Sequence, residues 1–186
     1  MLDLLLTRQS TPLLIEPAPS TEILAQAFAA AERAPDYGLL RPWRFLTIEG
    51  VAREKLGVVF VEAAKTMTAI SLTQSQEKKY LSMPLRAPLV IVVIARLQQH
   101  PKTSRDEQLL AVGAATQNLL VALHALGFAS IWRTGEMAYT ATVLSALGLS
   151  QDEQIAGFIY VGTPEKTQRQ KKLFQRPLNE FIDQWN

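Results

Sequence analysis

Near its middle the chain contains an unbroken apolar run, Leu89-Val90-Ile91-Val92-Val93-Ile94, which directly follows Pro88. Nearly all residues of this run are β-branched, and β-branched side chains pack well on a pleated sheet. A strand that faces water on one side alternates apolar and polar residues, whereas this run is apolar throughout. The run therefore predicts a central strand whose two faces are both buried.

Shorter segments on either side of the run also have strand patterns. Trp43–Glu49 alternates apolar and polar residues, which predicts a strand before the run. Ala129–Trp132 and Ile155–Val161 predict two strands after it, and Gly162-Thr163-Pro164 ends the last of them. These segments supply the neighbours that a central strand requires.

Helical patterns separate the predicted strands. Ser20 can cap a helix that Pro35 forces to end near Arg33. One face of this helix carries its apolar residues, which are Ile23, Leu24, Ala27, Phe28 and Ala31. Ser104-Arg105-Asp106-Glu107 is a capping box that starts a long helix, and this helix stops at Gly127.

Other segments complete the pattern. Leu2–Thr7 and Val51–Thr68 are predicted helices, and a further helix is predicted near Thr140–Leu147. Thr73–Leu85 is polar, and we expect a mobile helix or a loop there. Two helices precede the first strand and helices separate the later strands, which predicts an α+β fold with one sheet sandwiched by helices.

The composition indicates a single globular domain spanning residues 1–186. Hydrophobic residues make up 48% of the chain and charged residues 19%, which is sufficient for a buried core. The net charge of +2 gives no basis for a nucleic-acid partner. The absence of cysteine excludes disulfides, thiolate nucleophiles, zinc ribbons and iron–sulfur ligation.

Two apolar segments have to be considered as membrane or signal sequences, and neither indicates a membrane protein. Met1–Leu6 is too short for the apolar part of a signal peptide, and Asp3 stands where a basic residue is required. The stretch Leu109–Trp132 contains polar residues such as Gln117 and Asn118, which favours a buried core helix over a membrane span. We therefore expect a cytoplasmic protein without a membrane partner.

Residues 165–186 form a basic, proline-containing tail with no periodic face of its own. Its apolar residues require a surface to pack on, and they are Leu173, Phe174, Leu178, Phe181 and Trp185. A partner subunit is the favoured surface, and docking on the tail's own chain is the alternative.

The sequence lacks the familiar catalytic motifs. It contains no GxGxxG, GxxxxGK[ST] or GxSxG motif, and its two histidines, His100 and His124, have no metal-ligand spacing. We interpret His124, on the long apolar helix, as a satisfied core or interface residue. A bound cofactor is therefore the favoured source of reactivity, with the protein supplying binding, orientation and electrostatics.

Arginines at the ends of elements are candidates for binding an anionic cofactor. Arg8 and Ser10 lie at a helix-to-loop junction, and Arg33 lies at the end of a helix next to a proline turn. Arg133 directly follows a strand and precedes Thr134-Gly135. Each arginine alone is more often a solvated cap at the end of its element, so only the set together indicates a site.

Five sequence blocks together resemble the nitroreductase family, in its branch of short bacterial proteins with one domain. They follow the family's order and spacing from Leu4 to about Pro164. The blocks are Arg8-Gln9-Ser10, Arg33-Ala34-Pro35-Asp36-Tyr37, Pro42-Trp43-Arg44-Phe45, Gly127-Phe128-Ala129-Ser130-Ile131-Trp132-Arg133-Thr134-Gly135 and Gly157-Phe158-Ile159-Tyr160-Val161-Gly162-Thr163-Pro164.

The resemblance implies a homodimer in which each subunit has a central mixed, largely antiparallel sheet. It implies that the C-terminal tail packs on the partner subunit. It also implies a non-covalently bound FMN in each of two equivalent sites at the dimer interface, reduced by NADH or NADPH.

By the same resemblance, both subunits supply residues to each FMN. One subunit would supply Arg8, Gln9, Ser10, Trp132, Arg133 and Thr134. Of these, Arg8 and Ser10 would hold the phosphate, and Arg133 is expected near it. Arg33 and Tyr37 would reach the ring from the partner, where a cation would stabilise the anionic reduced flavin.

The sequence departs from the family pattern in the loop before Pro42. Leu39 and Arg41 stand where family members commonly have Asn and Gln, so the flavin edge must be met by backbone groups or by Arg41. Tyr37 stands where close relatives have His, which changes the wall of the substrate site. The tail matches poorly, so a role for Arg176 in phosphate binding is only a hypothesis.

The implied activity is a ping-pong reaction on small molecules. NADH or NADPH would reduce the flavin at N5, and a nitroaromatic or a quinone would then take the same place and accept the electrons, without a catalytic side chain. Alternatives remain: an enzyme of this fold with another redox task, such as dehalogenation or metabolite oxidation; a flavin-binding protein without turnover; or a dimer that binds no flavin.

Overall fold

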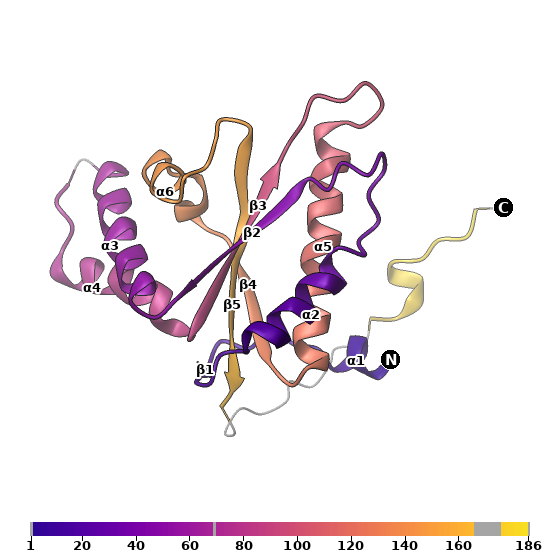
Figure 1. The fold of residues 1–186 in the computed structure, drawn as a ribbon, viewed down its shortest axis with the longest axis horizontal. Coiled ribbons are helices and arrows are strands. Elements are labelled where there is room, and N and C mark those ends of the chain that lie inside the picture. The colour runs from indigo at the N-terminus through magenta and orange to yellow at the C-terminus, as the bar shows by residue number, and fades with distance from the viewer. Residues whose placement is uncertain (1, 69, 166–175, 186) are drawn as a thin grey trace.

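The computed structural model describes residues 2–68, 70–165 and 176–185 and arranges them as helices on both faces of one sheet (Figure 1). The α-helices are α1 (Leu2–Thr7), α2 (Thr21–Ala31), α3 (Val51–Thr66), α4 (Gln74–Ser82), α5 (Arg105–Ala125) and α6 (Ala141–Ala146). The strands are β1 (Leu14–Ile15), β2 (Trp43–Glu49), β3 (Leu89–Arg96), β4 (Ala129–Arg133) and β5 (Glu153–Pro164). The 3-10 helices are η1 (Met83–Arg86), η2 (Glu136–Tyr139) and η3 (Leu178–Glu180).

β3 lies inside the sheet, with β2 on one side and β5 on the other. Leu89 lies opposite Glu49 of β2 and opposite Val161 of β5, and both pairings are antiparallel. β1 and β4 pair antiparallel with β5, whereas the isolated bridge between Ser10 and Ser130 is parallel. The predictions of a central β3 and of a mixed, largely antiparallel sheet are confirmed.

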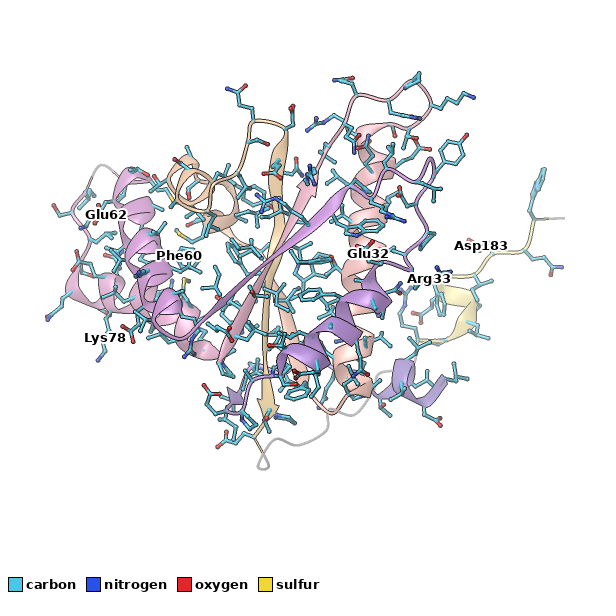
Figure 2. The ribbon with its side chains drawn as sticks, viewed as in Figure 1. Glu32, Arg33, Phe60, Glu62, Lys78 and Asp183 are labelled. Carbon is cyan, nitrogen blue, oxygen red and sulfur yellow. The ribbon has the colours of Figure 1, made fainter. Side chains whose placement is uncertain are left out.

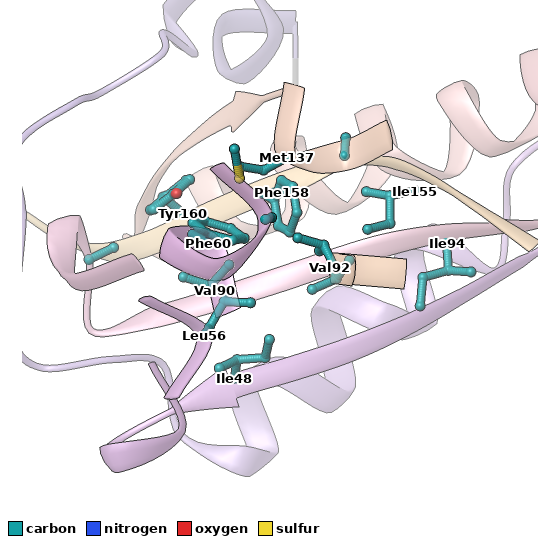
Figure 3. Close-up of a cluster of buried hydrophobic side chains, with 14 of the residues drawn as sticks. Ile48, Leu56, Phe60, Val90, Val92, Ile94, Met137, Ile155, Phe158 and Tyr160 are labelled. Atoms are coloured by element: carbon teal, nitrogen blue, oxygen red, sulfur yellow. The ribbon is translucent and has the colours of Figure 1, made fainter. Parts of the chain in front are cut away.

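The side chains of β3 alternate between two apolar cores. One core lies between the sheet and the layer of α3 and α6, and it receives Val90, Val92 and Ile94 (Figure 3). The other lies between the sheet and the layer of α2 and α5, and it receives Leu89, Ile91 and Val93. All of these side chains are completely buried, which explains why the run contains no polar residue.

Side-chain caps set the starts of the helices. The Ser20 hydroxyl accepts a hydrogen bond from the Ile23 amide ahead of α2. At α5, Glu107 accepts from the Ser104 amide at 2.6 Å, and the Ser104 hydroxyl accepts from the Glu107 amide at 3.2 Å. The capping box predicted for this helix is therefore confirmed. The helix predicted over Val51–Thr68 ends slightly earlier than expected, at Thr66.

Thr73–Leu85 forms a regular helix followed by η1, so of the two alternatives expected here the helix is confirmed and the loop is wrong. Thr73 and Gln76 form a capping box, in which the Thr73 amide donates to Gln76 Oε1 at 2.8 Å. The new helix, α4, packs tightly on α3. A side chain at Gly57 would lie 2.5 Å from the carbonyl oxygen of Leu81, so only glycine permits this approach.

Among the described residues, one helix, α5, is long and apolar enough to cross a membrane by length and composition. In the fold it packs against α2 and the sheet, and Val112, Ala115, Leu119 and Leu123 enter the core. The core helix of a globular protein has this placement.

The described part of the tail exposes its apolar side chains. Leu178 is 68% exposed, Phe181 54% and Trp185 100%. Arg176 contacts Glu180 through its guanidinium and lies over the Phe181 ring. Leu173 and Phe174 of the predicted tail lie outside the described residues. The tail residues that are described therefore do not bury their apolar surface on their own chain.

Candidate cofactor-binding site

The outer edge of β4 has backbone groups available for a ligand. β5 pairs with one edge of β4, and Thr11 donates its amide to the Ser130 carbonyl on the other edge at 3.1 Å. Because backbone groups alternate along a strand, the amide and carbonyl of Trp132 point to the same outer edge as those of Ser130. No strand in the described part of the chain pairs with them there.

Arg8 lies near one end of this edge, beside a cavity of about 390 Å³ that we call the α1 cavity. The cavity is lined by Thr7, Arg8, Gln9, Thr11, His124, Gly127, Phe128, Ala129, Ser130, Pro164 and Glu165. α1 ends at Thr7, so Arg8 leaves the helix and the next residues run along β4. The Arg8 guanidinium is half-buried and makes no hydrogen bond or ion pair with a described residue.

His124 faces the α1 cavity from α5. Its Nε2 lies 3.1 Å from the Thr7 hydroxyl, which is hydrogen-bond distance. This contact joins the ends of α1 and α5 and agrees with the interpretation of His124 as a satisfied residue.

Arg133 lies at the other end of β4, beside a cavity of about 480 Å³ that we call the α4 cavity. It is lined by Phe60, Lys79, Tyr80, Met83, Arg86, Arg133, Thr134, Gly135, Glu136, Met137, Phe158 and Tyr160. Gly135 has φ +119°, a conformation that favours glycine, and nothing lies within 4 Å of the position of a Cβ there. The backbone at the end of β4 is therefore open to close approach by a ligand.

Trp132 lies on the opposite face of the sheet from Arg133. Its indole donates a hydrogen bond from Nε1 to the Ala156 carbonyl at 3.2 Å and covers Gly157. A side chain at Gly157 would collide with the indole, so glycine at this position allows Trp132 to lie against β5. Trp132 therefore presents mainly its backbone to the outer edge of β4.

Tyr160 is the deepest polar residue of the α4 cavity. Burial raises the pKa of its hydroxyl, and the nearby cations Arg86 and Arg133 partly offset this effect. The hydroxyl is consequently protonated at neutral pH and able to donate a hydrogen bond.

Arg33 and Tyr37 do not join the other predicted site residues within one chain. Arg33 follows α2, on the face of the sheet opposite to α3 (Figure 2). Its side chain makes no hydrogen bond or ion pair with a described residue. Tyr37 is 64% exposed in the loop that follows. This loop places Leu39 and Arg41 at φ +53° and +45°, which is strained backbone for residues other than glycine.

Sequence reasoning did not identify three polar residues of the α4 cavity, namely Lys79, Arg86 and Tyr160. Lys79 and Arg86 come from a segment for which no definite structure was predicted, and Tyr160 was assigned only to a core strand. The alternation of side chains along β5 could have predicted which face of the sheet carries Tyr160. It could not have predicted that Lys79 and Arg86 lie near Tyr160, because that depends on the packing of α4 against the sheet.

The fold is shared with solved structures of nitroreductases and nitroreductase-like proteins. A nitroreductase-like protein from Bacillus cereus superposes with a TM-score of 0.82 at 21% identity, covering 99% of this chain and 95% of that one. The FMN-dependent nitroreductase of Mycobacterium smegmatis, solved in complex with NADPH, superposes with a TM-score of 0.77 at 18% identity, covering 98% and 96%. The protein therefore has the nitroreductase fold.

Sequence comparison gives the family. YdjA of Escherichia coli K12, which is named as an NAD(P)H nitroreductase, is 37% identical over 164 residues, or 88% of each chain. A Haemophilus influenzae protein named in the same way is 33% identical over 91% of each chain. The model of the nitroreductase family matches residues 8–163. The chain belongs to the nitroreductase family, which is a family of oxidoreductases.

Proposed function

We propose that this protein is an FMN-dependent oxidoreductase that takes reducing equivalents from NADH or NADPH. The observation that carries the proposal is the outer edge of β4, where no described strand pairs with the backbone groups of Trp132 and where an arginine lies beside each end. An anionic, planar cofactor with polar ring edges suits such an edge. The names of relatives and of solved structures with this fold support the choice of FMN and NAD(P)H.

The residues present fit FMN. Arg8 and Ser10, with Gln9 between them, would hold the phosphate, because the Arg8 guanidinium has no described partner and Ser10 is exposed. The backbone of Trp132 and the residue Thr134 would contact the polar edge of the flavin ring. They would replace amide side chains, because Leu39 and Arg41 stand at the two loop positions where such side chains are expected. Arg133 would supply positive charge beside the ring rather than at the phosphate, since it lines the α4 cavity and not the α1 cavity.

A second copy of the chain would complete each site. Arg33 and Tyr37 are exposed and lie away from the edge of β4 in their own chain, so only a partner subunit can bring them to a flavin there. The exposed apolar tail residues, such as Phe181 and Trp185, supply surface for such a partner. We therefore infer a homodimer with two equivalent sites.

When bound, FMN would supply the hydride chemistry, with nitroaromatic or quinone acceptors following the reductant in the same place. The protein would orient the substrates, exclude water and present cations where negative charge develops. The proposed reaction uses NAD(P)H and small acceptors, and we expect it to take place in the cytoplasm.

A flavin-binding protein without turnover is the second candidate. Leu39 and Arg41 occupy strained positions in the loop where polar contacts to the flavin edge are expected. If these contacts are missing, the protein binds flavin but does not reduce acceptors efficiently.

Two measurements test the proposal. Purified protein is expected to be yellow and to release FMN on denaturation, and colourless protein that does not bind added FMN would refute the cofactor assignment. The holoprotein is expected to oxidise NADH or NADPH in the presence of a quinone. Bound FMN without this oxidation would favour the second candidate.

A further inference from the structure

The α4 cavity holds more positive charge than the proposed flavin requires. Lys79, Arg86 and Arg133 line it together with a single carboxylate, Glu136. Neither Arg86 nor Arg133 has an ion pair or a side-chain hydrogen bond to a described residue. The Lys79 ammonium lies over the Tyr80 ring, 5.7 Å from its centroid, and makes no ion pair with a described residue. With Arg133 assigned to the flavin, Arg86 and Lys79 remain as cations without a described anionic partner.

Tyr160 adds a hydrogen-bond donor to this cavity. The residue is only 5% exposed, yet its hydroxyl makes no hydrogen bond to a described residue. The ring is buried, but the hydroxyl itself reaches the surface of the cavity, so it is open to water or to a ligand. Arg86 and Arg133 lie near enough to influence the titration of the hydroxyl, so donor and cations converge on one region.

Aromatic side chains form much of the remaining wall of the cavity. The rings of Phe60 and Phe158 meet edge to face with their centroids 5.6 Å apart, and Tyr160 and Met137 lie next to them (Figure 3). Tyr80 adds a fourth ring from α4. A volume of about 480 Å³ accommodates a single-ring compound.

We propose that the α4 cavity is an acceptor subsite that selects an aromatic substrate bearing a carboxylate. This inference rests on the proposed function, because it names the class of acceptor used at the same site. Arg86, Lys79 and the Tyr160 hydroxyl bind the carboxylate, and the aromatic walls contact the ring. The acceptor then lies beside Arg133 and Thr134, which are the residues proposed to line the flavin.

Equilibrium binding tests the subsite without turnover. The purified protein is titrated calorimetrically with benzoate and with its neutral isostere benzamide. We expect benzoate to bind at least tenfold more tightly, and Arg86→Gln and Lys79→Gln each to reduce that preference several-fold. Lys78→Gln is the matched control, because Lys78 is the neighbour of Lys79 on α4 but lies on the outer side of the helix, away from the cavity (Figure 2). It is expected to bind both probes as the parent does.

Turnover with 4-nitrobenzoate and 4-nitrobenzamide then tests the link to catalysis. The ratio of kcat/KM values is expected to favour the carboxylate in the parent and to fall about tenfold in Arg86→Gln. Equal affinities for benzoate and benzamide in the parent would overturn the inference. The inference would also be overturned if Lys79→Gln changed the preference for NADPH over NADH but left benzoate binding unchanged. In that case the cations would bind the phosphate of the reductant and not a carboxylate of the acceptor.

The flavin content of each variant separates the hypothesis of FMN binding from the hypothesis of a carboxylate subsite. If Arg86→Gln loses FMN while keeping the preference for benzoate, Arg86 binds the flavin and the proposed subsite is wrong. If the parent binds benzoate selectively but holds no FMN, the subsite stands and the proposed function fails.

Discussion

Glu153 forms the strongest ion pair in the described part of the chain. Arg44 donates two hydrogen bonds to its carboxylate, at 2.6 and 2.8 Å, and Arg96 lies 3.6 Å away. The hydrogen bonds from Arg44 lower the pKa of Glu153 from 4.5 to about 2, against the opposing effect of its burial. This clamp joins β2 to the start of β5 across β3, and it fixes the end of the sheet opposite to the proposed site.

The lowered pKa of Glu153 predicts a pH dependence of stability. In the unfolded chain the Glu153 carboxyl becomes protonated near pH 4.5, whereas in the folded protein it stays ionised until about pH 2. The ion pair therefore stabilises the fold fully above about pH 5, and this stabilisation is lost as the pH falls toward 2. Glu153→Gln is expected to lower the free energy of unfolding at pH 7 by about 2 kcal/mol and to flatten this acid loss. Urea unfolding from pH 7 to pH 3 measures both effects. Glu62→Gln, which breaks only the exposed pair with Lys65, is the control, and equal effects of the two variants would contradict the prediction.

Arg8 allows a test of phosphate binding. Arg8→Ala is expected to weaken FMN binding about tenfold to a hundredfold, because a charge-assisted contact contributes about 1.5–3 kcal/mol. Flavin retained after dialysis measures this, and thermal unfolding shows whether the fold is intact. Arg105→Ala removes another exposed arginine and should change neither quantity. Equal flavin content in Arg8→Ala and the parent would exclude Arg8 from the site.

Arg33 allows a test of the contribution from the partner subunit. Its side chain makes no hydrogen bond or ion pair with a described residue, whereas Asn118 donates to the Ala30 carbonyl at the end of α2, so a helix cap is already present. A guanidinium near the ring favours the anionic reduced flavin, so Arg33→Met should keep most of the FMN but lower its midpoint potential by about 20–45 mV. Redox titration measures the shift. An unchanged potential with lowered thermal stability would show that Arg33 serves only its own helix.

At the scale of elements, the packing of α4 on α3 shapes the α4 cavity. Lys79, Tyr80 and Met83 reach the cavity because Gly57 lets the backbone of α4 approach α3. Gly57→Ala is expected to push α4 outward and to lower the free energy of unfolding by about 1–3 kcal/mol.

Thermal and urea unfolding of Gly57→Ala, together with benzoate affinity, test this role of α4. Val58→Ala changes a half-exposed neighbour on α3 and should stay within about 0.5 kcal/mol of the parent. A Gly57→Ala variant that matches Val58→Ala in both stability and benzoate binding would show that the contact between the helices is not needed.

The elements differ in how far they could be predicted from sequence. β3 was predictable because a strand covered on both faces needs apolar residues throughout, and α5 because its capping box is a local signal. β1 could not be predicted from the sequence, because Leu14–Ile15 is a strand only through its pairing with the end of β5. α4 is polar and half-exposed, so its apolar pattern is weak, and its position depends on the contact with Gly57.

The same distinction applies to the candidate site. The ends of α1 and β4 could be predicted from local patterns, and these ends place Arg8 and Arg133. The parallel bridge between Ser10 and Ser130, which brings the two segments onto one edge, is a contact between residues far apart in sequence. Local sequence patterns do not encode such contacts, so the resemblance to the family was needed to connect the segments.

At the scale of the whole molecule, the chain is expected to be a dimer in solution. Its interface should exceed the roughly 2,000 Å² per pair that is typical of obligate dimers. Phe181→Glu is expected to weaken the dimer and to lower its flavin content, because a charge would be buried against the partner. Asn179→Glu, on the 3-10 helix that ends just before Phe181, is the control. Light scattering at micromolar concentration tests this, and a flavin-loaded monomer of the parent would contradict it.

The tryptophans occupy three different environments, which gives the molecule a set of intrinsic optical reporters. Trp43 is 5% exposed and donates to Glu32, Trp132 is 37% exposed beside the proposed flavin edge, and Trp185 is fully exposed in the tail. The chain contains no other tryptophan. Emission of Trp43 at short wavelength would therefore report on the core. Energy transfer from Trp132 to a bound flavin would report on the cofactor site. Quenching of Trp185 by iodide would report on contact with a partner. Single replacements by Phe would let one spectrum distinguish loss of fold, of cofactor and of assembly.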